Sequence, residues 1–332
     1  MKALQSMNLI HYIALTSAFL GAVFVGNNFL TYIFDVPGVS GTLALIGLNL
    51  YEPVIDSYSA GSYVIGVIQV LSYILAIIFP IYVIANRLKF RDDKLTHLCA
   101  EVVIASAFWA VMFIGIADAL ISFFRIEGIL PSIVGEELAL SLGKPAFRGT
   151  FVHIPLLFFG ILIAIFRRGI DFIWLALLIV LGELLIVITR FIFSYEQAFM
   201  GDLVRFWYAG LFLFSSAYTL VHEGHVRVDV LYANFSNKSK SYTNIFGSLI
   251  LGIPLCWVVL LRGLWNQSSP FNLALLNFEV TQQGFGMYVK YLMSGFLIIF
   301  ALSMLFQFCS YIIYYINRLE HKEELDEGIE VK

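Results

Sequence analysis

The chain has 332 residues, of which 60% are hydrophobic and only 13% are charged, and its mean hydropathy is +0.87. A soluble domain is about half apolar and a quarter charged, so this composition excludes an ordinary soluble protein and predicts a polytopic membrane protein. The formal net charge is −3 and the chain has no dense basic cluster, which excludes nucleic acid as a partner.

Apolar segments recur along the whole chain, and most of them approach the ~20 residues that a helix needs to cross a bilayer. The first is too long, and too weakly charged at its start, for a signal peptide, so a retained helix is expected. The sequence therefore predicts an all-α protein with about eight transmembrane helices. In chain order these are residues 8–34, 62–85, 99–124, 150–166, 170–193, 203–221, 243–264 and 288–316.

Two shorter elements are expected between the spans, an interfacial piece at residues 41–50 and an amphipathic helix at residues 133–142. Within the spans the interruptions are single prolines, Pro80, Pro155 and Pro254. Transporters often hold their ions at broken helices, so the absence of longer breaks argues against a transport site carried by this chain alone.

Basic residues indicate the orientation of the spans, because cytoplasmic loops of membrane proteins are enriched in Lys and Arg. A cytoplasmic N-terminus puts 13 of the 20 basic residues on the cytoplasmic side, among them the cluster at residues 87–94 and Arg167-Arg168. The opposite orientation would place both of these clusters outside. The sequence therefore predicts that both termini are cytoplasmic.

Three polar residues lie inside the predicted spans, where charged groups face protein or water rather than lipid. Glu183 lies seven residues before Arg190, and Asp118 lies seven residues before Arg125. Glu183 is either a structural contact to a neighbouring helix or part of a coupling-ion or inter-subunit site. A structural ion pair is favoured over a proton relay for Asp118, and a helix-interface role over metal ligation for His153.

Motifs for catalysis or cofactor binding are missing. The chain has no Walker motif, no Gly-x-Ser-x-Gly and no His-Glu-x-x-His, so ATP-driven or hydrolytic activity has no residues to support it. His222 and His225 have helical spacing, but a metal site needs three or four ligands. The cysteines Cys99, Cys256 and Cys309 are scattered and odd in number, which predicts buried free thiols. No enzyme activity, metal or cofactor is expected.

A compact polar signal, Gly224-His225-Val226-Arg227-Val228-Asp229, follows the span at residues 203–221. It lies where the chain would leave the hydrocarbon, so Arg227 is expected to reach the lipid headgroups. Asp229 would pair with Arg227 or with a partner subunit. The alternation from Val226 onward suits an extended segment, while a helix would put Arg227 near Leu231, and the sequence does not choose between the two.

This stretch resembles the small membrane subunit of the tripartite ATP-independent periplasmic (TRAP) transporters, the DctQ type. Upstream, Arg190-Phe191 and the run Asp202-Leu-Val-Arg205-Phe-Trp207 look like further family patterns, and two apolar segments follow as in the family. The resemblance covers roughly residues 170–318. The matching positions, expected to serve structure or partner contact, are Arg190, Asp202, Arg205, Trp207, Gly224, His225, Arg227 and Asp229.

The resemblance implies a non-catalytic subunit of a sodium-coupled importer of an organic acid or similar solute, located in the bacterial inner membrane. Its implied partners are a large permease subunit, which it braces, and a periplasmic solute-binding protein, which it helps to dock. The chain would then consist of a four-span extension at residues 1–168, a small-permease domain at 169–318 and a charged cytoplasmic tail at 319–332. Residues 183–316 are expected to supply the flank for the large subunit, and the extension would pack outside or extend the scaffold toward lipid.

A different class of function stays open from the residues alone. The chain could be a self-contained, ion-coupled secondary transporter or channel, with Glu183 and Asp118 lining its path. Internal symmetry or broken helices would favour this alternative, whereas a membrane enzyme lacks any convincing catalytic set.

Overall fold

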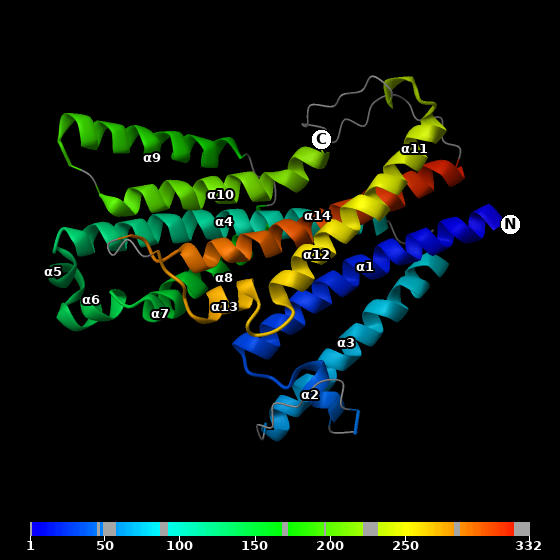
Figure 1. The fold of residues 1–332 in the computed structure, drawn as a ribbon, viewed down its shortest axis with the longest axis horizontal. Helices are drawn as coiled ribbons and strands as arrows, with labels where there is room; N and C mark the ends of the chain where they lie inside the picture. The colour runs from blue at the N-terminus through cyan, green and yellow to red at the C-terminus, as the bar shows by residue number, and fades with distance from the viewer. Residues whose placement is uncertain are drawn as a thin grey trace. The chain divides into compact units, whose positions relative to one another are not determined.

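A computed structural model of the chain describes residues 2–44, 47–48, 58–86, 92–167, 172–195, 197–221, 232–281 and 286–321. All regular structure in these ranges is helical, and they contain no strand (Figure 1). The predicted all-α fold is confirmed.

The helices follow one another through short connections. Their bounds are α1 (Lys2–Ile33), α2 (Gly38–Ala44), α3 (Ala60–Ala85), α4 (Asp92–Ile126), α5 (Leu130–Val134), α6 (Glu136–Leu142), α7 (Pro145–Arg148), η1 (Gly149–His153), α8 (Ile154–Phe166), α9 (Ile173–Ile192), α10 (Ala198–Val221), η2 (Tyr232–Asn234), α11 (Asn237–Phe246), η3 (Gly247–Gly252), α12 (Ile253–Leu264), α13 (Pro270–Leu276) and α14 (Lys290–His321).

Seven helical stretches in the described ranges are long and apolar enough to cross a membrane. They are Met7–Ile33, Ala60–Ala85, Asp92–Ile126, Pro145–Phe166, Ile173–Ile192, Asn237–Leu264 and Lys290–Leu319, and each coincides with a predicted span. The chain is therefore a multi-pass membrane protein. The side on which its termini lie stays a prediction.

The eighth predicted span, residues 203–221, forms most of α10. This helix has 24 residues, and a rise of 1.5 Å per residue gives it about 36 Å, enough for a hydrocarbon core of ~30 Å. It is not among the seven, because Arg205 and several Tyr, Ser and Thr residues dilute its apolar sequence.

The shorter elements differ in detail from the expectation. The interfacial piece is a single short helix, α2. The amphipathic helix expected at residues 133–142 is two helices, α5 and α6, because Gly135 between them has a φ of 85°. A left-handed backbone at this residue ends one helix, and glycine adopts it without a steric penalty.

Two of the three prolines follow a local widening of the helix. The π turns η1 and η3 lead into α8 and α12, and in each case the second residue of the α-helix is a proline, Pro155 or Pro254. The N–H of Ile154 donates to the carbonyl of Gly149, five residues earlier. Proline lacks an N–H and crowds the carbonyl four residues before it, so a wider turn accommodates it without breaking the helix.

The chain divides into two compact units that do not follow the order of the sequence. Unit 1 consists of Met1–Cys99, Val221–Gln267 and Met304–Lys332, and unit 2 consists of Ala100–Leu220 and Ser268–Ser303. Each unit thus combines residues from both sides of position 168. The predicted boundary there describes the extent of the family resemblance, and as a domain boundary it stays a prediction.

In unit 1 the first helix packs against helices from both ends of the sequence. Leu15 of α1 forms a buried cluster with Val83 of α3 and Ile313 of α14. Polar contacts follow the same helix: Trp257 Nε1 of α12 donates to Ser17 Oγ at 2.7 Å, and Nε2 of buried His11 lies 2.5 Å from Asp92 Oδ2. The N-terminal helix is therefore part of the core of this unit.

In unit 2 the helices approach one another at small residues. Gly160 of α8 lies against the backbone of Ala110 in α4, and Gly115 of α4 lies against the indole of Trp207 in α10. A methyl group at either glycine would overlap its neighbour, so glycine sets the distance between the helices. On the other side of α10, Phe206 and Phe214 pack on Phe296 of α14 with ring centroids 5.2 and 4.9 Å apart; the latter pair is edge-to-face.

Candidate functional site

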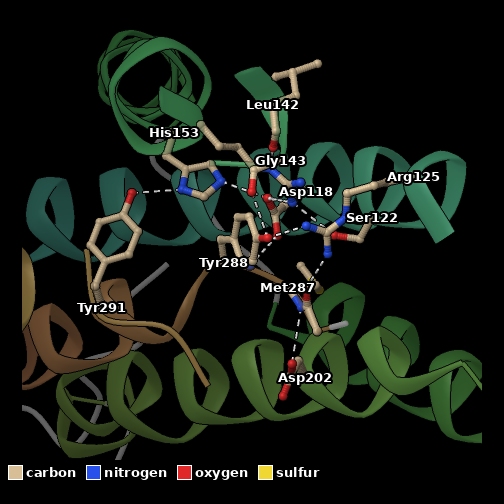
Figure 2. Close-up of polar contacts among 12 residues, drawn as sticks. Asp118, Ser122, Arg125, Leu142, Gly143, His153, Asp202, Met287, Tyr288 and Tyr291 are labelled. Atoms are coloured by element: carbon tan, nitrogen blue, oxygen red, sulfur yellow. Dashed lines mark hydrogen bonds and ion pairs between the residues drawn. The ribbon is translucent and has the colours of Figure 1, made fainter. Parts of the chain in front are cut away.

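Asp118 is the centre of a buried polar network in unit 2 (Figure 2). It lies on α4 and its side chain has no exposed surface. Oδ1 accepts a hydrogen bond from Arg148 Nη1 at 2.8 Å and lies 3.0 Å from His153 Nε2, while Oδ2 accepts from the backbone N–H of Tyr288 at 2.9 Å. Both carboxylate oxygens are therefore bonded, which is what a buried carboxylate requires.

Arg148 supplies the compensating charge. It ends the short helix α7 and is fully buried. Its Nε donates to the carbonyl of Leu142 at 3.0 Å, and Nη1 also donates to Ser122 Oγ at 3.0 Å. Nη2 has no hydrogen-bond partner in the described part of the chain, but the guanidinium lies 4.3 Å from the centroid of the Tyr288 ring. The π face of that ring provides a favourable surface for the rest of the cation.

Tyr288 is held between two cations. Arg125, one turn before the end of α4, has its guanidinium carbon 4.7 Å from the ring centroid and donates to the Tyr288 hydroxyl. The hydroxyl in turn donates to the carbonyl of Gly143 at 2.9 Å. Arg125 therefore contacts the segment before α14, while Asp118 is paired with Arg148, so the expectation that Asp118 and Arg125 form a pair is corrected. The seven-residue spacing gave the right face of α4, but a closer cation reaches the carboxylate from α7.

His153 completes the network at the end of the π turn η1. Its Nδ1 lies 2.8 Å from the hydroxyl of Tyr291, and its Nε2 faces Asp118. An ionised carboxylate only accepts, so this geometry fits a neutral imidazole that donates through Nε2 and accepts the tyrosine hydroxyl through Nδ1. The predicted role of His153 as a bonded helix-interface residue is what the structure shows.

Asp202, in the first turn of α10, holds the same segment from the other side. Its Oδ2 accepts the backbone N–H of Met287 at 3.2 Å and lies 3.3 Å from Thr281 Oγ1. The exposed Arg205 reaches Oδ1 at 3.7 Å. Asp118 and Asp202 thus bond the backbone N–H groups of two consecutive residues, Tyr288 and Met287, and fix the entry into α14 (Figure 2).

The network therefore joins three parts of the sequence. Asp118 and Arg148 come from the N-terminal extension, Asp202 from the start of α10, and Tyr288 and Tyr291 from the region of the family resemblance. Two buried opposite charges with bonded neighbours form a rigid scaffold, because removing either partner leaves an uncompensated charge. The sequence did not indicate Arg148 or the two tyrosines, since the only signal was a polar linker and aromatic residues are abundant throughout.

The remaining predicted polar position, Glu183, lies apart from this network. It is exposed in the middle of α9. Arg190, two turns further on, lies near the end of the helix with its guanidinium carbon 5.9 Å from the Phe191 ring centroid. Asp118 is buried and internally bonded whereas Glu183 is exposed, so the structure gives the two carboxylates different surroundings.

The remaining motif positions divide into two groups. Trp207 is buried, with its indole against Gly115, and Arg205 is 67% exposed. Residues 222–231, which contain Gly224, His225, Arg227 and Asp229, lie outside the described residues, and the prediction for that segment stays as the sequence gives it. Among the described residues, no group of three His, Cys, Asp or Glu side chains is placed to hold a metal ion.

Comparison with known proteins gives one match. Residues 177–313 match the family of tripartite ATP-independent periplasmic transporters, DctQ component. No curated protein and no solved structure matches the chain at a significant level. The DctQ family is a transporter component and not an enzyme family. The chain therefore carries a DctQ-type domain, the small permease component of TRAP transporters, behind an N-terminal extension of several long helices.

Proposed function

We propose that this protein is the small transmembrane subunit of a TRAP-type, sodium-coupled importer in the bacterial inner membrane. The observation that carries this proposal is the match of residues 177–313 to the DctQ component. The subunit braces a large permease and helps to dock a periplasmic binding protein, and the solute is an organic acid or a similar small molecule. The large permease carries the solute and the coupling ion.

The buried network supports a bracing role. Asp118 and Arg148 are fully enclosed and bonded to each other. Such a pair keeps the ends of α4, α7 and α14 in one arrangement, because it loses its compensation when any of them moves. A subunit that supports a moving partner benefits from a rigid interior of this kind.

The N-terminal extension takes part in the same scaffold. Through Leu15 it contributes to the core of unit 1, and through Asp118 and Arg148 it contributes to unit 2. We propose that the extension enlarges the brace and that residues 1–168 fold together with the DctQ-type domain. Arg190, Arg205 and the polar segment at Gly224–Asp229 then serve contacts at the membrane surface, with lipid headgroups or with partner subunits.

Reconstitution into vesicles tests this function. The purified chain alone should move no solute. Adding the large permease and the binding protein should give uptake that depends on a sodium gradient. Robust uptake by this polypeptide alone would refute the subunit role and support the self-contained transporter instead.

A further inference from the structure

An exposed carboxylate lies in the middle of the least buried candidate span. Glu183 is the eleventh of the 20 residues of α9 (Ile173–Ile192). Only 11% of the apolar window of this helix is buried, compared with 22–67% for the other six candidate spans. Figure 1 shows α9 lying alongside α10. In the described part of the chain Glu183 makes no hydrogen bond or ion pair.

The two faces of α9 have different surroundings. One face is turned inward: Leu175 is fully buried, and Gly182 lies against Val204 of α10. Glu183 shares the other face with Val180 and Val187, three residues before it and four after it, and these are 61% and 49% exposed. The carboxylate is thus surrounded by exposed aliphatic side chains and is not covered by α10.

Such a position is unfavourable against lipid. An acidic side chain at the centre of a bilayer is disfavoured by about 3 kcal/mol or more, and such residues normally face protein or water. At mid-depth the side chain is too short to reach the headgroups from the centre of a 20-residue helix. The face of α9 around Glu183 therefore requires a protein cover that carries a complementary group.

Charge selects the kind of cover. A second copy of this chain, docked symmetrically through the same face, would bring two Glu183 carboxylates together, and like charges in a medium of low dielectric repel strongly. A helix that presents Lys or Arg at the same depth would instead supply the opposite charge. We propose that the face of α9 formed by Val180, Glu183 and Val187 is the docking surface for a membrane-spanning partner subunit, which places a basic side chain against Glu183.

This inference rests on the proposed function, since the partner is then the large permease subunit. It adds which surface of the small subunit is used and what chemistry the partner offers there. The exposed position of Glu183 also makes the residue suitable for testing, because substituting it removes no contact within the described chain.

The test uses the full chain produced together with the large permease. Glu183→Lys should lower the amount of large subunit that co-purifies by about tenfold or more, because it puts two cations together, whereas Glu183→Gln should lower it less. Glu137→Lys, a charge reversal at an exposed residue of α6, is the matched control and should leave recovery unchanged. Changing the intramembrane basic residues of the permease to Glu one at a time should identify one that restores binding to Glu183→Lys.

A photo-crosslinker distinguishes the possible covers. Placed at Val187 it should join this chain to the large subunit, and placed at Phe158, an exposed residue of α8, it should not. Crosslinks between two copies, crosslinks within one chain, or normal co-purification of Glu183→Lys would each overturn the assignment of this face while leaving the proposed function intact. If the wild-type chain does not bind the large permease at all, the proposed function fails and this inference fails with it. Size-exclusion profiles of each variant alone show whether it is folded.

Discussion

The carboxylate of Asp118 and the guanidinium of Arg148 form an ion pair of 2.8 Å in which neither side chain has any exposed surface. The two residues come from α4 and α7, separated by five turns or more of intervening chain. The pair therefore ties the end of a long helix to the irregular segment that precedes α8.

Breaking this pair should destabilise the protein strongly. Arg148→Met leaves the Asp118 carboxylate buried and uncompensated, so we expect a loss of about 3–5 kcal/mol, seen as a large fall in the midpoint of thermal unfolding in detergent. The double variant Asp118→Leu with Arg148→Met removes both charges and should recover most of that loss. Equal midpoints for the wild type and Arg148→Met would show that the pair contributes nothing to stability.

The shape of the cation should matter as well as its charge. Arg148→Lys keeps a positive charge, but one ammonium group cannot reproduce the bonds that Nε and Nη1 make to Leu142, Asp118 and Ser122 at once. We expect a midpoint between those of the wild type and Arg148→Met. Thermal unfolding of the three proteins side by side checks this order, and a wild-type midpoint for Arg148→Lys would contradict it.

Gly115 should not tolerate a side chain. A methyl group there would come within 2.3 Å of Trp207 Nε1, so Gly115→Ala must push the indole or separate α4 from α10. Overpacking of this kind typically destabilises by about 1–3 kcal/mol. Gly201→Ala is the matched control, because nothing lies within 4 Å of its Cβ position and a helical alanine is itself slightly stabilising. Tryptophan fluorescence during thermal unfolding measures both variants, and equal behaviour of the two would disprove the contact.

Asp202 should anchor the segment before α14 through its acceptor oxygen. Asp202→Ala leaves the N–H of Met287 without a partner, and we expect a loss of about 1–3 kcal/mol. Asp202→Asn keeps an acceptor oxygen and should lose less. Limited proteolysis at residues 277–289 is the readout: the alanine variant should be cut faster than the asparagine variant, and the reverse order would refute the anchoring role.

The orientation predicted from the basic residues can be tested by cysteine labelling. In a background without Cys99, Cys256 and Cys309, an impermeant maleimide added to intact cells with a permeabilised outer membrane should not modify Ser239→Cys, because α11 is expected on the cytoplasmic side. Glu136→Cys, on the exposed helix α6, is expected outside and should be labelled. Labelling of Ser239→Cys with protection of Glu136→Cys would reverse the topology.

The sequence by itself determined the membrane class, the helical fold and the family resemblance. These properties are local: a run of apolar residues is compared with a bilayer of constant thickness, as for α9 and α14, and the run from Asp202 to Trp207 is read directly along the chain. For the same reason the ends of the spans agree with the structure to within a few residues at most positions.

Only the tertiary structure decided which polar residues are partners. Asp118 and Arg148 are 30 positions apart, and Tyr288 is 170 positions from Asp118, so no spacing along one helix could reveal that they meet. The split at Gly135 and the interleaving of the extension with the DctQ-type domain also depend on backbone conformation and packing between distant segments. The same applies to Glu183: its position in an apolar helix is visible in the sequence, but its exposure is settled only by which face of α9 packs on α10, because a helix has one face for each neighbour and composition alone does not say which face that is.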